Sequence, residues 1–238
     1  MKNNNLFWER FNKKNFKLGL SHLFDRKKFN DEITYPYNQI NEIRSILVIL
    51  LEVFKKKLFF LDYGGSLISN SYLFSITQKK FRNKNFFKNV SCNIYNPQYN
   101  FLENKSFLKF KKIILKNTPI NFISKIPKTK KYDLVIFGSC LQYEKKLSNI
   151  DLFKKKKPEF VLITQTPISE SNKSYECIQQ NHKVLNYVHT LNDIKKKLLK
   201  NRYEIIYISS INPVMTGFKK KDYFKKVNYL NIIFKLVK

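Results

Sequence analysis

The chain has 238 residues, an apolar fraction of 43% and a formal net charge of +29, values that suit one globular domain with an N-terminal extension. So large a positive charge is common in nucleic-acid-binding proteins, but only five of the 46 basic residues are arginine, the residue best suited to bidentate phosphate and base contacts. The absence of alanine and the abundance of Asn, Ile, Phe and Tyr indicate the bias of an AT-rich genome, so a dedicated nucleic-acid interface is not favoured.

Residues 1–55 are predicted to form a partly helical N-terminal extension. Residues 1–38 have no clear hydrophobic periodicity and lack the apolar segment of a secretory signal peptide. Residues 39–55 place apolar side chains at helical spacing and predict an amphipathic helix. The longest apolar run, Ile46 to Leu51, is far shorter than the ~20 residues needed to span a bilayer. The sequence therefore predicts a cytoplasmic protein without a transmembrane segment.

Residues 56–238 are predicted to form one α/β domain. Short apolar runs bounded by turn residues predict strands, and segments with helical spacing separate several of them. This alternation indicates a mainly parallel sheet, whereas the last two strands have no helix between them and are expected to pair antiparallel at its edge. The seven predicted strands are 58–62, 90–95, 111–115, 132–138, 159–164, 203–209 and 229–237. The predicted helices are 68–80, 147–157 and 191–200.

Two connections are predicted to lack regular structure. Residues 116–131 contain Pro119 and Pro127 and are interpreted as an irregular crossover. Residues 168–190 are polar, show little periodicity and are interpreted as a long connection. Thr166-Pro167 is expected to end the fifth strand.

The three cysteines predict thiols rather than a disulfide or a metal site. Cys92, Cys140 and Cys177 are odd in number, widely spaced and free of any C-x-x-C pair. This usage is typical of a reducing compartment and agrees with the cytoplasmic prediction.

The segment Leu58 to Tyr72, LFFLDYGGSLISNSY, contains the most informative local pattern. An apolar strand ends in Asp62, and two of the five glycines, Gly64 and Gly65, follow at once. Glycine permits a sharp turn and the close approach of a ligand, and a following helix N-terminus would offer unpaired N–H groups. A strand–glycine turn–helix element is how doubly wound folds hold nucleotide-like cofactors. The alternative is a tight turn that binds nothing, because short glycine motifs are weak signals.

Three further segments narrow the interpretation: Ile94-Tyr95-Asn96-Pro97, LVIFGSCLQY at 134–143 and FVLITQTP at 160–167. With LDYGG, and in this order, they resemble a group of class I S-adenosylmethionine-dependent methyltransferases often encoded among surface-polysaccharide genes. The resemblance covers about residues 55 to 238. It implies a Rossmann-like sheet of seven strands, with S-adenosylmethionine as cofactor.

The resemblance also implies a cofactor site. Asp62 would accept hydrogen bonds from backbone N–H groups or from the methionyl amino group, and the glycines would let the chain pass beneath the cofactor. The chain departs from the class I pattern at Ser66 and Ile68, where further glycine is usual, and at Asn96, where an acidic residue usually binds the ribose. The predicted cofactor-binding residues are Asp62, Gly64, Gly65, Asn96, Ser139 and Gln142.

Catalytic residues are harder to predict. Tyr143 would line the cofactor or the acceptor, or else pack the next helix, while His182 and His189 lie in the 168–190 connection and are weak candidates for a general base. His22 is expected to be structural. No metal site, H-E-x-x-H pair, P-loop or Ser-His-Asp spacing is found in the sequence.

Three functions remain open from the sequence. The first is transfer of a methyl group to a small acceptor, which the resemblance extends to a sugar or glycan precursor. The second is a catalytically degenerate methyltransferase fold that serves as a scaffold or binding protein, suggested by Ser66, Ile68 and Asn96. The third is an RNA methyltransferase or RNA-binding protein, suggested by the lysine excess.

Overall fold

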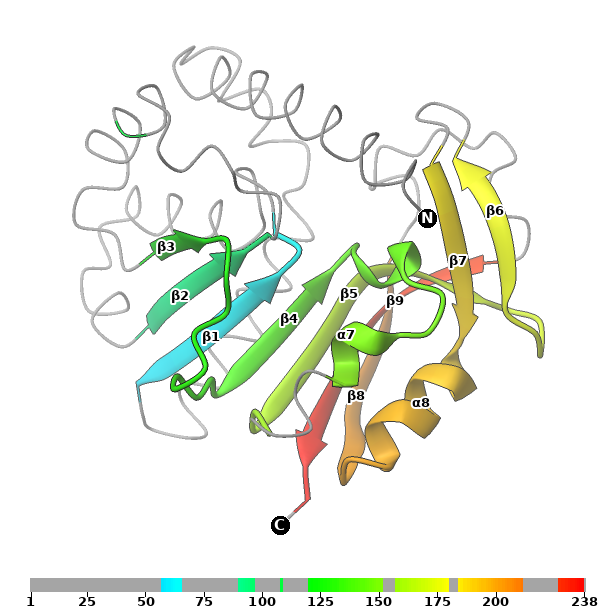
Figure 1. Ribbon diagram of the computed structural model, residues 1–238. Helices are drawn as coiled ribbons and strands as arrows, with labels where there is room; N and C mark the ends of the chain where they lie inside the picture. The colour runs from blue at the N-terminus through cyan, green and yellow to red at the C-terminus, as the bar shows by residue number, and fades with distance from the viewer. Residues whose placement is uncertain are drawn as a thin grey trace. The chain divides into compact units, whose positions relative to one another are not determined.

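A computed structural model describes residues 57–65, 90–96, 108, 120–151, 157–179, 184–211 and 227–237 (Figure 1). The chain divides into two compact units, Met1–Lys128 and Thr129–Lys238, called here the first and second units. The predicted helices at 39–55 and 68–80, the predicted strand at 111–115, His22, Ser66, Ile68 and His182 lie outside the described residues. The predicted boundary between residues 55 and 56 stays a prediction.

The first unit contains three parallel strands in the order β3-β2-β1. β1 is Leu58–Tyr63 and β2 is Val90–Tyr95, as predicted to within a residue, and Leu58 pairs with Val90. Both strands are almost continuously buried, with Leu61 and Ile94 fully covered. Near-continuous apolar runs of this kind suit parallel strands that are covered on both faces.

β3, Ile120–Ile123, corrects one prediction, because it lies inside the segment interpreted as an irregular crossover. It pairs with β2 from Cys92 to Tyr95. Its four residues include only one buried side chain, Ile120, so the apolar signal is short. The prolines on either side obscured it, although proline is tolerated just outside a strand.

The second unit is built around β5, Phe160–Ser169. β4, Leu134–Gly138, pairs with it in parallel, and β9, Val227–Leu236, pairs with it antiparallel. β8, Tyr203–Ile211, pairs antiparallel with β9. The predicted strands at 132–138, 203–209 and 229–237, and the antiparallel pairing of the last two, are confirmed.

The predicted end of the fifth strand at Thr166-Pro167 is wrong, because β5 continues to Ser169. The pairing of β5 with β9 shifts between Ile163 and Thr166, and Gln165 has a positive φ of 53°. These are the marks of a β-bulge, one of the few places where a sheet accommodates proline. After the bulge, Pro167 lies opposite Tyr229 and the pairing resumes.

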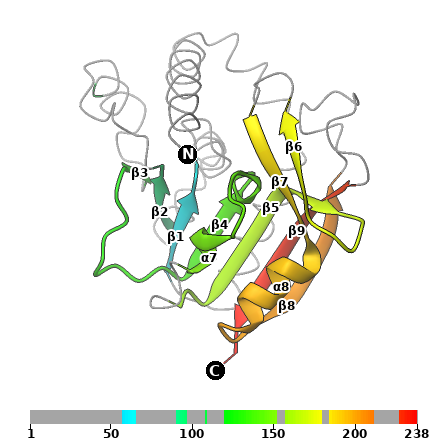
Figure 2. The ribbon, with the colours of Figure 1, turned by 45° about the vertical axis from the view of Figure 1, so that its right-hand side comes forward.

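The polar connection predicted at 168–190 is instead largely an antiparallel hairpin. It consists of β6, Tyr175–Gln179, and β7, Val184–Thr190, and β7 joins β5 in parallel at Ile168 and Ser169 (Figure 2). Three of the buried positions of β7 carry the polar residues Asn186, His189 and Thr190, so the sequence shows little hydrophobic periodicity. With this hairpin, the described residues form nine strands rather than the seven predicted.

Two helices and one 3₁₀ turn complete the described part of the second unit. α8, Leu191–Leu199, confirms its prediction: the Thr190 hydroxyl accepts from the Asp193 N–H at 3.0 Å, and Ile194 and Leu198 are buried. α8 lies beside β8 in both views (Figures 1 and 2). The described part of the predicted 147–157 helix is α7, Ser148–Asp151, and the 3₁₀ turn η1, Leu141–Tyr143, precedes it.

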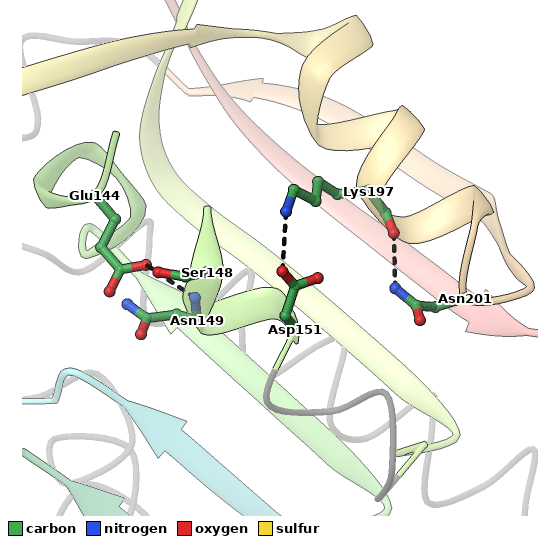
Figure 3. Close-up of polar contacts among 6 residues, drawn as sticks. All are labelled: Glu144, Ser148, Asn149, Asp151, Lys197 and Asn201. Atoms are coloured by element: carbon green, nitrogen blue, oxygen red, sulfur yellow. Dashed lines mark hydrogen bonds and ion pairs between the residues drawn. The ribbon is translucent and has the colours of Figure 1, made fainter. Parts of the chain in front are cut away.

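Polar contacts hold α7 in place (Figure 3). The Glu144 carboxylate accepts hydrogen bonds from the Ser148 hydroxyl at 3.0 Å and the Asn149 N–H at 2.8 Å. From α8, the Lys197 ammonium lies 3.0 Å from the Asp151 carboxylate. These charged groups therefore serve to fix the segment after η1 against α8. None of the helices in the described ranges is long and apolar enough to cross a membrane.

Candidate functional site

The glycine turn after β1 is fixed by the backbone of β2. Gly64 has a positive φ of 75°, a conformation that residues with a Cβ rarely adopt. Its N–H donates to the Tyr95 carbonyl at 2.8 Å, so the turn begins against the carboxyl end of β2. Carboxyl ends of parallel strands are where open α/β sheets bind ligands.

Gly65 is required by close packing rather than by its backbone angles. A Cβ at this position would lie 2.6 Å from Ile94 Cγ2, 3.0 Å from Asp62 Cγ and 3.1 Å from Asp62 Oδ2. The Asp62 carboxylate is thus packed directly beneath the turn, with only 4% of the residue exposed. The structure brings the predicted residues Asp62, Gly64 and Gly65 together.

Asn96 reaches the same turn. Its side-chain Nδ2 donates a long hydrogen bond of 3.5 Å to the Gly65 carbonyl, and its backbone N–H donates to the Ile123 carbonyl at 3.2 Å. Four of the six predicted cofactor residues therefore lie at one end of the β1–β2 pair. The side chain of Asn96 contacts the turn itself, a role that the motif alone did not suggest.

Two tyrosines were missed by the sequence interpretation. Tyr63 and Tyr95 are register partners at the ends of β1 and β2, with ring centroids 5.0 Å apart and planes tilted by 54°. Tilted rings at this spacing attract one another. The signal was present in the sequence, because each tyrosine directly precedes the turn that ends its strand.

The other predicted cofactor residues belong to the second unit, after β4. Ser139 has a positive φ of 53°, and its N–H donates to the Thr164 carbonyl at 2.9 Å. The Gln142 side-chain nitrogen donates to the Ser139 hydroxyl at 3.1 Å. Gln142 is only 2% exposed, and within the described residues its Oε1 has no hydrogen-bond partner. A buried acceptor without a donor is costly to keep, which marks Gln142 as a candidate ligand contact.

Tyr143 stands among groups that stay uncharged. Burial raises its pKa to about 12, against a smaller lowering by the Gln142 side chain. The pKa of Tyr229 is raised chiefly by burial and further by its neighbours Cys177, Tyr175 and Tyr143, and burial raises the pKa of Cys177 to about 11. Near neutral pH Tyr143 is a hydrogen-bond donor, not a base. The cluster offers neutral hydroxyl and thiol groups.

His189 is placed away from solvent. It is 3% exposed, and its Nε2 lies 2.8 Å from the Glu144 carbonyl, to which it donates. Burial lowers the pKa of His189, although hydrogen bonds to the backbone of Glu144 and Leu141 and the charges of Asp193 and Glu144 oppose this. The ring therefore connects β7 to the segment after η1 in its neutral form.

The buried imidazole predicts a loss of stability in mild acid. Because the folded-state pKa of His189 is lowered, its contribution is fully present above the unfolded value of about 6.5 and is lost as the pH falls through the folded value. We expect His189→Gln, which keeps a side-chain donor, to lose less stability than the native chain as the pH falls from about 7 to about 5. Urea unfolding at each pH measures this. Parallel curves for the two chains would contradict it.

Exposed charged contacts join the β6–β7 hairpin to the segment after η1. The Lys145 ammonium lies 2.6 Å from the Glu176 carboxylate on β6 and 5.9 Å from the centre of the Tyr187 ring on β7. Both partners of the ion pair are well exposed, so we expect little stability from it. No group of three His, Cys, Asp or Glu side chains suited to a metal ion occurs in the described ranges.

Comparison with known proteins identifies the fold. Neither a family model nor a curated protein sequence matches the chain. Many solved structures do. An O-methyltransferase from a trans-AT PKS multienzyme of Brevibacillus brevis, in complex with S-adenosyl-L-homocysteine, matches with TM-score 0.57 and 12% identity over 91% of this chain and 79% of that one. The 1,6-didemethyltoxoflavin-N1-methyltransferase of Burkholderia thailandensis matches with TM-score 0.55 and 9% identity, over 92% of this chain and 85% of that one.

A third match is magnesium protoporphyrin IX methyltransferase from Synechocystis PCC 6803 with bound S-adenosylhomocysteine, at TM-score 0.52 and 12% identity over 84% of both chains. Identities this low show the fold alone. The strand orders β3-β2-β1 and β4-β5-β9-β8 are those of the two halves of the class I methyltransferase sheet.

Proposed function

We propose that this protein is an S-adenosylmethionine-dependent methyltransferase that acts on a small, uncharged polar acceptor. The observation that carries the proposal is the turn at the end of β1. There a buried Asp62 lies beneath Gly65 at van der Waals distance, and Gly64 has a positive φ. Turns at the carboxyl ends of parallel strands are where open α/β sheets hold nucleotide-like cofactors, and all three matched structures described above contain S-adenosylhomocysteine by name.

In the first unit the proposed cofactor-binding residues are Asp62, Gly64, Gly65 and Asn96. In the second unit they are Ser139 and Gln142. The glycines permit close approach of the ligand, and the Asp62 carboxylate can accept from its amino group. S-adenosylmethionine, when bound, would supply an activated methyl group. The chain's own residues would orient the acceptor for in-line transfer.

The acceptor is proposed to be a sugar or glycan precursor in the cytoplasm. This part of the proposal rests on the resemblance of the sequence to methyltransferases encoded among surface-polysaccharide genes. Buried His189 donates to a backbone carbonyl, so it is a poor candidate for the base. The acceptor would therefore lose its proton to water or to a residue not yet identified.

Calorimetry tests the cofactor part of the proposal. Titration of the folded full chain with S-adenosylhomocysteine should give saturable, one-site binding. No heat at millimolar ligand, which corresponds to a binding free energy weaker than about −4 kcal/mol, would reject the enzyme. Binding of the cofactor without methyl transfer to any supplied sugar nucleotide would favour the scaffold alternative, which Asn96 at the usual acidic position suggests.

Gln142 offers a test of ligand contact that separates function from folding. Replacement by methionine removes an acceptor that lacks a partner in the described structure, together with one hydrogen bond to Ser139. The two effects oppose one another, so we expect the free energy of unfolding to change by less than about 1 kcal/mol. Cofactor affinity or turnover should fall about tenfold, the effect of one lost hydrogen bond. A large loss of stability with unchanged affinity would make Gln142 structural.

The RNA alternative stays a prediction from the lysine excess. It would require affinity for RNA greater than that of other proteins with the same compositional bias, measured at physiological salt. Equal affinity would dismiss it.

A further inference from the structure

Three consecutive residues of β2 and its end hold the glycine turn of the first unit. Ile94 packs against Gly65 so closely that a Cβ there would lie 2.6 Å from its Cγ2. The Tyr95 carbonyl accepts from the Gly64 N–H at 2.8 Å. Asn96 then donates from Nδ2 to the Gly65 carbonyl at 3.5 Å. The turn is therefore contacted by one apolar group, one acceptor and one donor in succession.

The chemistry of the last contact depends on an amide. The Gly65 carbonyl can only accept a hydrogen bond, so its partner must donate. A side-chain amide donates at every pH, whereas an ionised carboxylate cannot donate at all. A carboxylate at position 96 would also place a second negative charge beside the turn that already covers the Asp62 carboxylate.

We propose that Asn96 is a positioning residue that holds the Gly65 carbonyl and thereby sets the shape of the turn. In this chain the amide is a working alternative to the acidic residue usual at this place, and not a mark of lost function. The inference about ligand affinity rests on the proposed function, whereas the inference about the shape of the turn does not.

The decisive variant is Asn96→Asp, which changes an amide to a carboxylate of the same size. Near pH 7.5 we expect it to disturb the turn and to weaken S-adenosylhomocysteine binding about tenfold. The lone pairs of the Gly65 carbonyl disfavour the ionised form, so the pKa of the new carboxyl should rise above its ordinary value of about 3.9. As the pH falls through that raised pKa, the protonated carboxyl can donate and the native turn should return.

Glycine resonances provide a direct view of the turn. The chain has five glycines, at positions 19, 64, 65, 138 and 217, so selective nitrogen-15 glycine labelling gives at most five amide signals. In Asn96→Asp the Gly64 and Gly65 signals should shift, and the Gly64 amide should exchange faster. These changes should reverse between about pH 7.5 and pH 5, while the Gly138 signal stays in place.

Two further variants serve as controls. Asn121→Asp puts the same charge on an exposed residue of β3 in the same unit, and should leave the turn and the affinity unchanged at every pH. The loss of stability in mild acid that is expected from His189 affects both variants equally. Comparing Asn121→Asp with Asn96→Asp at each pH therefore removes it. Asn96→Ala removes the donor without adding charge, and should weaken binding by a constant factor that does not vary with pH.

Unchanged Gly64 and Gly65 signals in Asn96→Asp at neutral pH would overturn the proposal, as would tighter cofactor binding by this variant. The tighter binding would assign position 96 to the ribose instead. If the native chain binds no S-adenosylhomocysteine but the glycine signals respond as expected, the positioning role stands and the proposed function fails. If the native chain binds S-adenosylhomocysteine but the Gly64 and Gly65 signals do not respond, the proposed function stands and the positioning role of Asn96 fails.

Discussion

Replacing Gly65 by alanine is expected to weaken the binding of S-adenosylhomocysteine about a hundredfold. The added methyl group would lie 2.6 Å from Ile94 Cγ2 and 3.0 Å from Asp62 Cγ, and neither neighbour has room to withdraw. Ile94 is fully buried and branched at Cβ, and Asp62 is held in register with it. Overpacking of this kind costs about 1–3 kcal/mol. The strain falls on the residues proposed to hold the cofactor, so affinity should fall by a hundredfold or so.

Gly138→Ala is the matched control for this prediction. Gly138 also ends a parallel strand, but a Cβ there would lie 3.7 Å from Thr164 Cγ2, an ordinary contact distance. Its substitution should change the free energy of unfolding by less than about 1 kcal/mol and leave cofactor affinity intact. Calorimetry and urea unfolding of the two variants make the comparison. Equal behaviour of the two would show that the close packing at Gly65 has no functional consequence.

Phe234→Ala should produce the largest loss of stability. The side chain is fully buried on β9, opposite Val161 of β5 on one side and Ile205 of β8 on the other. Removing a buried phenylalanine ring typically costs about 3–5 kcal/mol, a large part of the 5–15 kcal/mol that holds most domains folded. We therefore expect a mostly insoluble protein, or one that unfolds at much lower urea.

Two milder variants keep this prediction testable if Phe234→Ala fails to fold. Phe234→Leu retains most of the volume and should cost less than about 1.5 kcal/mol. Val237→Ala truncates a residue just beyond the end of the same strand that is 43% exposed, and should have almost no effect. We expect the urea midpoint to be lowest for Phe234→Ala, higher for Phe234→Leu and highest for Val237→Ala. A Phe234→Ala chain as stable as Val237→Ala would contradict the buried position of Phe234 between β5 and β8.

The sequence was sufficient wherever apolar residues predominate in a strand. β1, β2, β4 and the β8–β9 pair are such strands, and the capped amphipathic helix α8 was equally clear. β7 was missed because polar Asn186, His189 and Thr190 occupy three of its buried positions, where a pattern search requires apolar residues. The extension of β5 was missed because Pro167 normally excludes a strand interior, and the bulge that admits it depends on pairing with β9.

The site shows the same division between local and spatial information. Asp62, Gly64 and Gly65 are adjacent in the sequence, and their motif was enough to find them. That Gly65 is in close contact with Ile94, or that Asn96 donates to the Gly65 carbonyl, depends on the register of β1 and β2. The neutral state of Tyr143 depends on burial by segments distant in the sequence, which no local pattern encodes.

The bulge in β5 also separates the part of this strand that pairs with β4 from the part that pairs with β7. On one edge of β5, β4 pairs as far as Thr164, and β7 takes over only at Ile168 and Ser169. On the other edge, β9 pairs on both sides of the bulge. The hairpin is thus attached to β5 at two residue pairs, beyond the stretch that pairs with β4 and on the edge opposite β9. A change in the length or charge of this hairpin can therefore leave the pairing of β4 with β5 undisturbed.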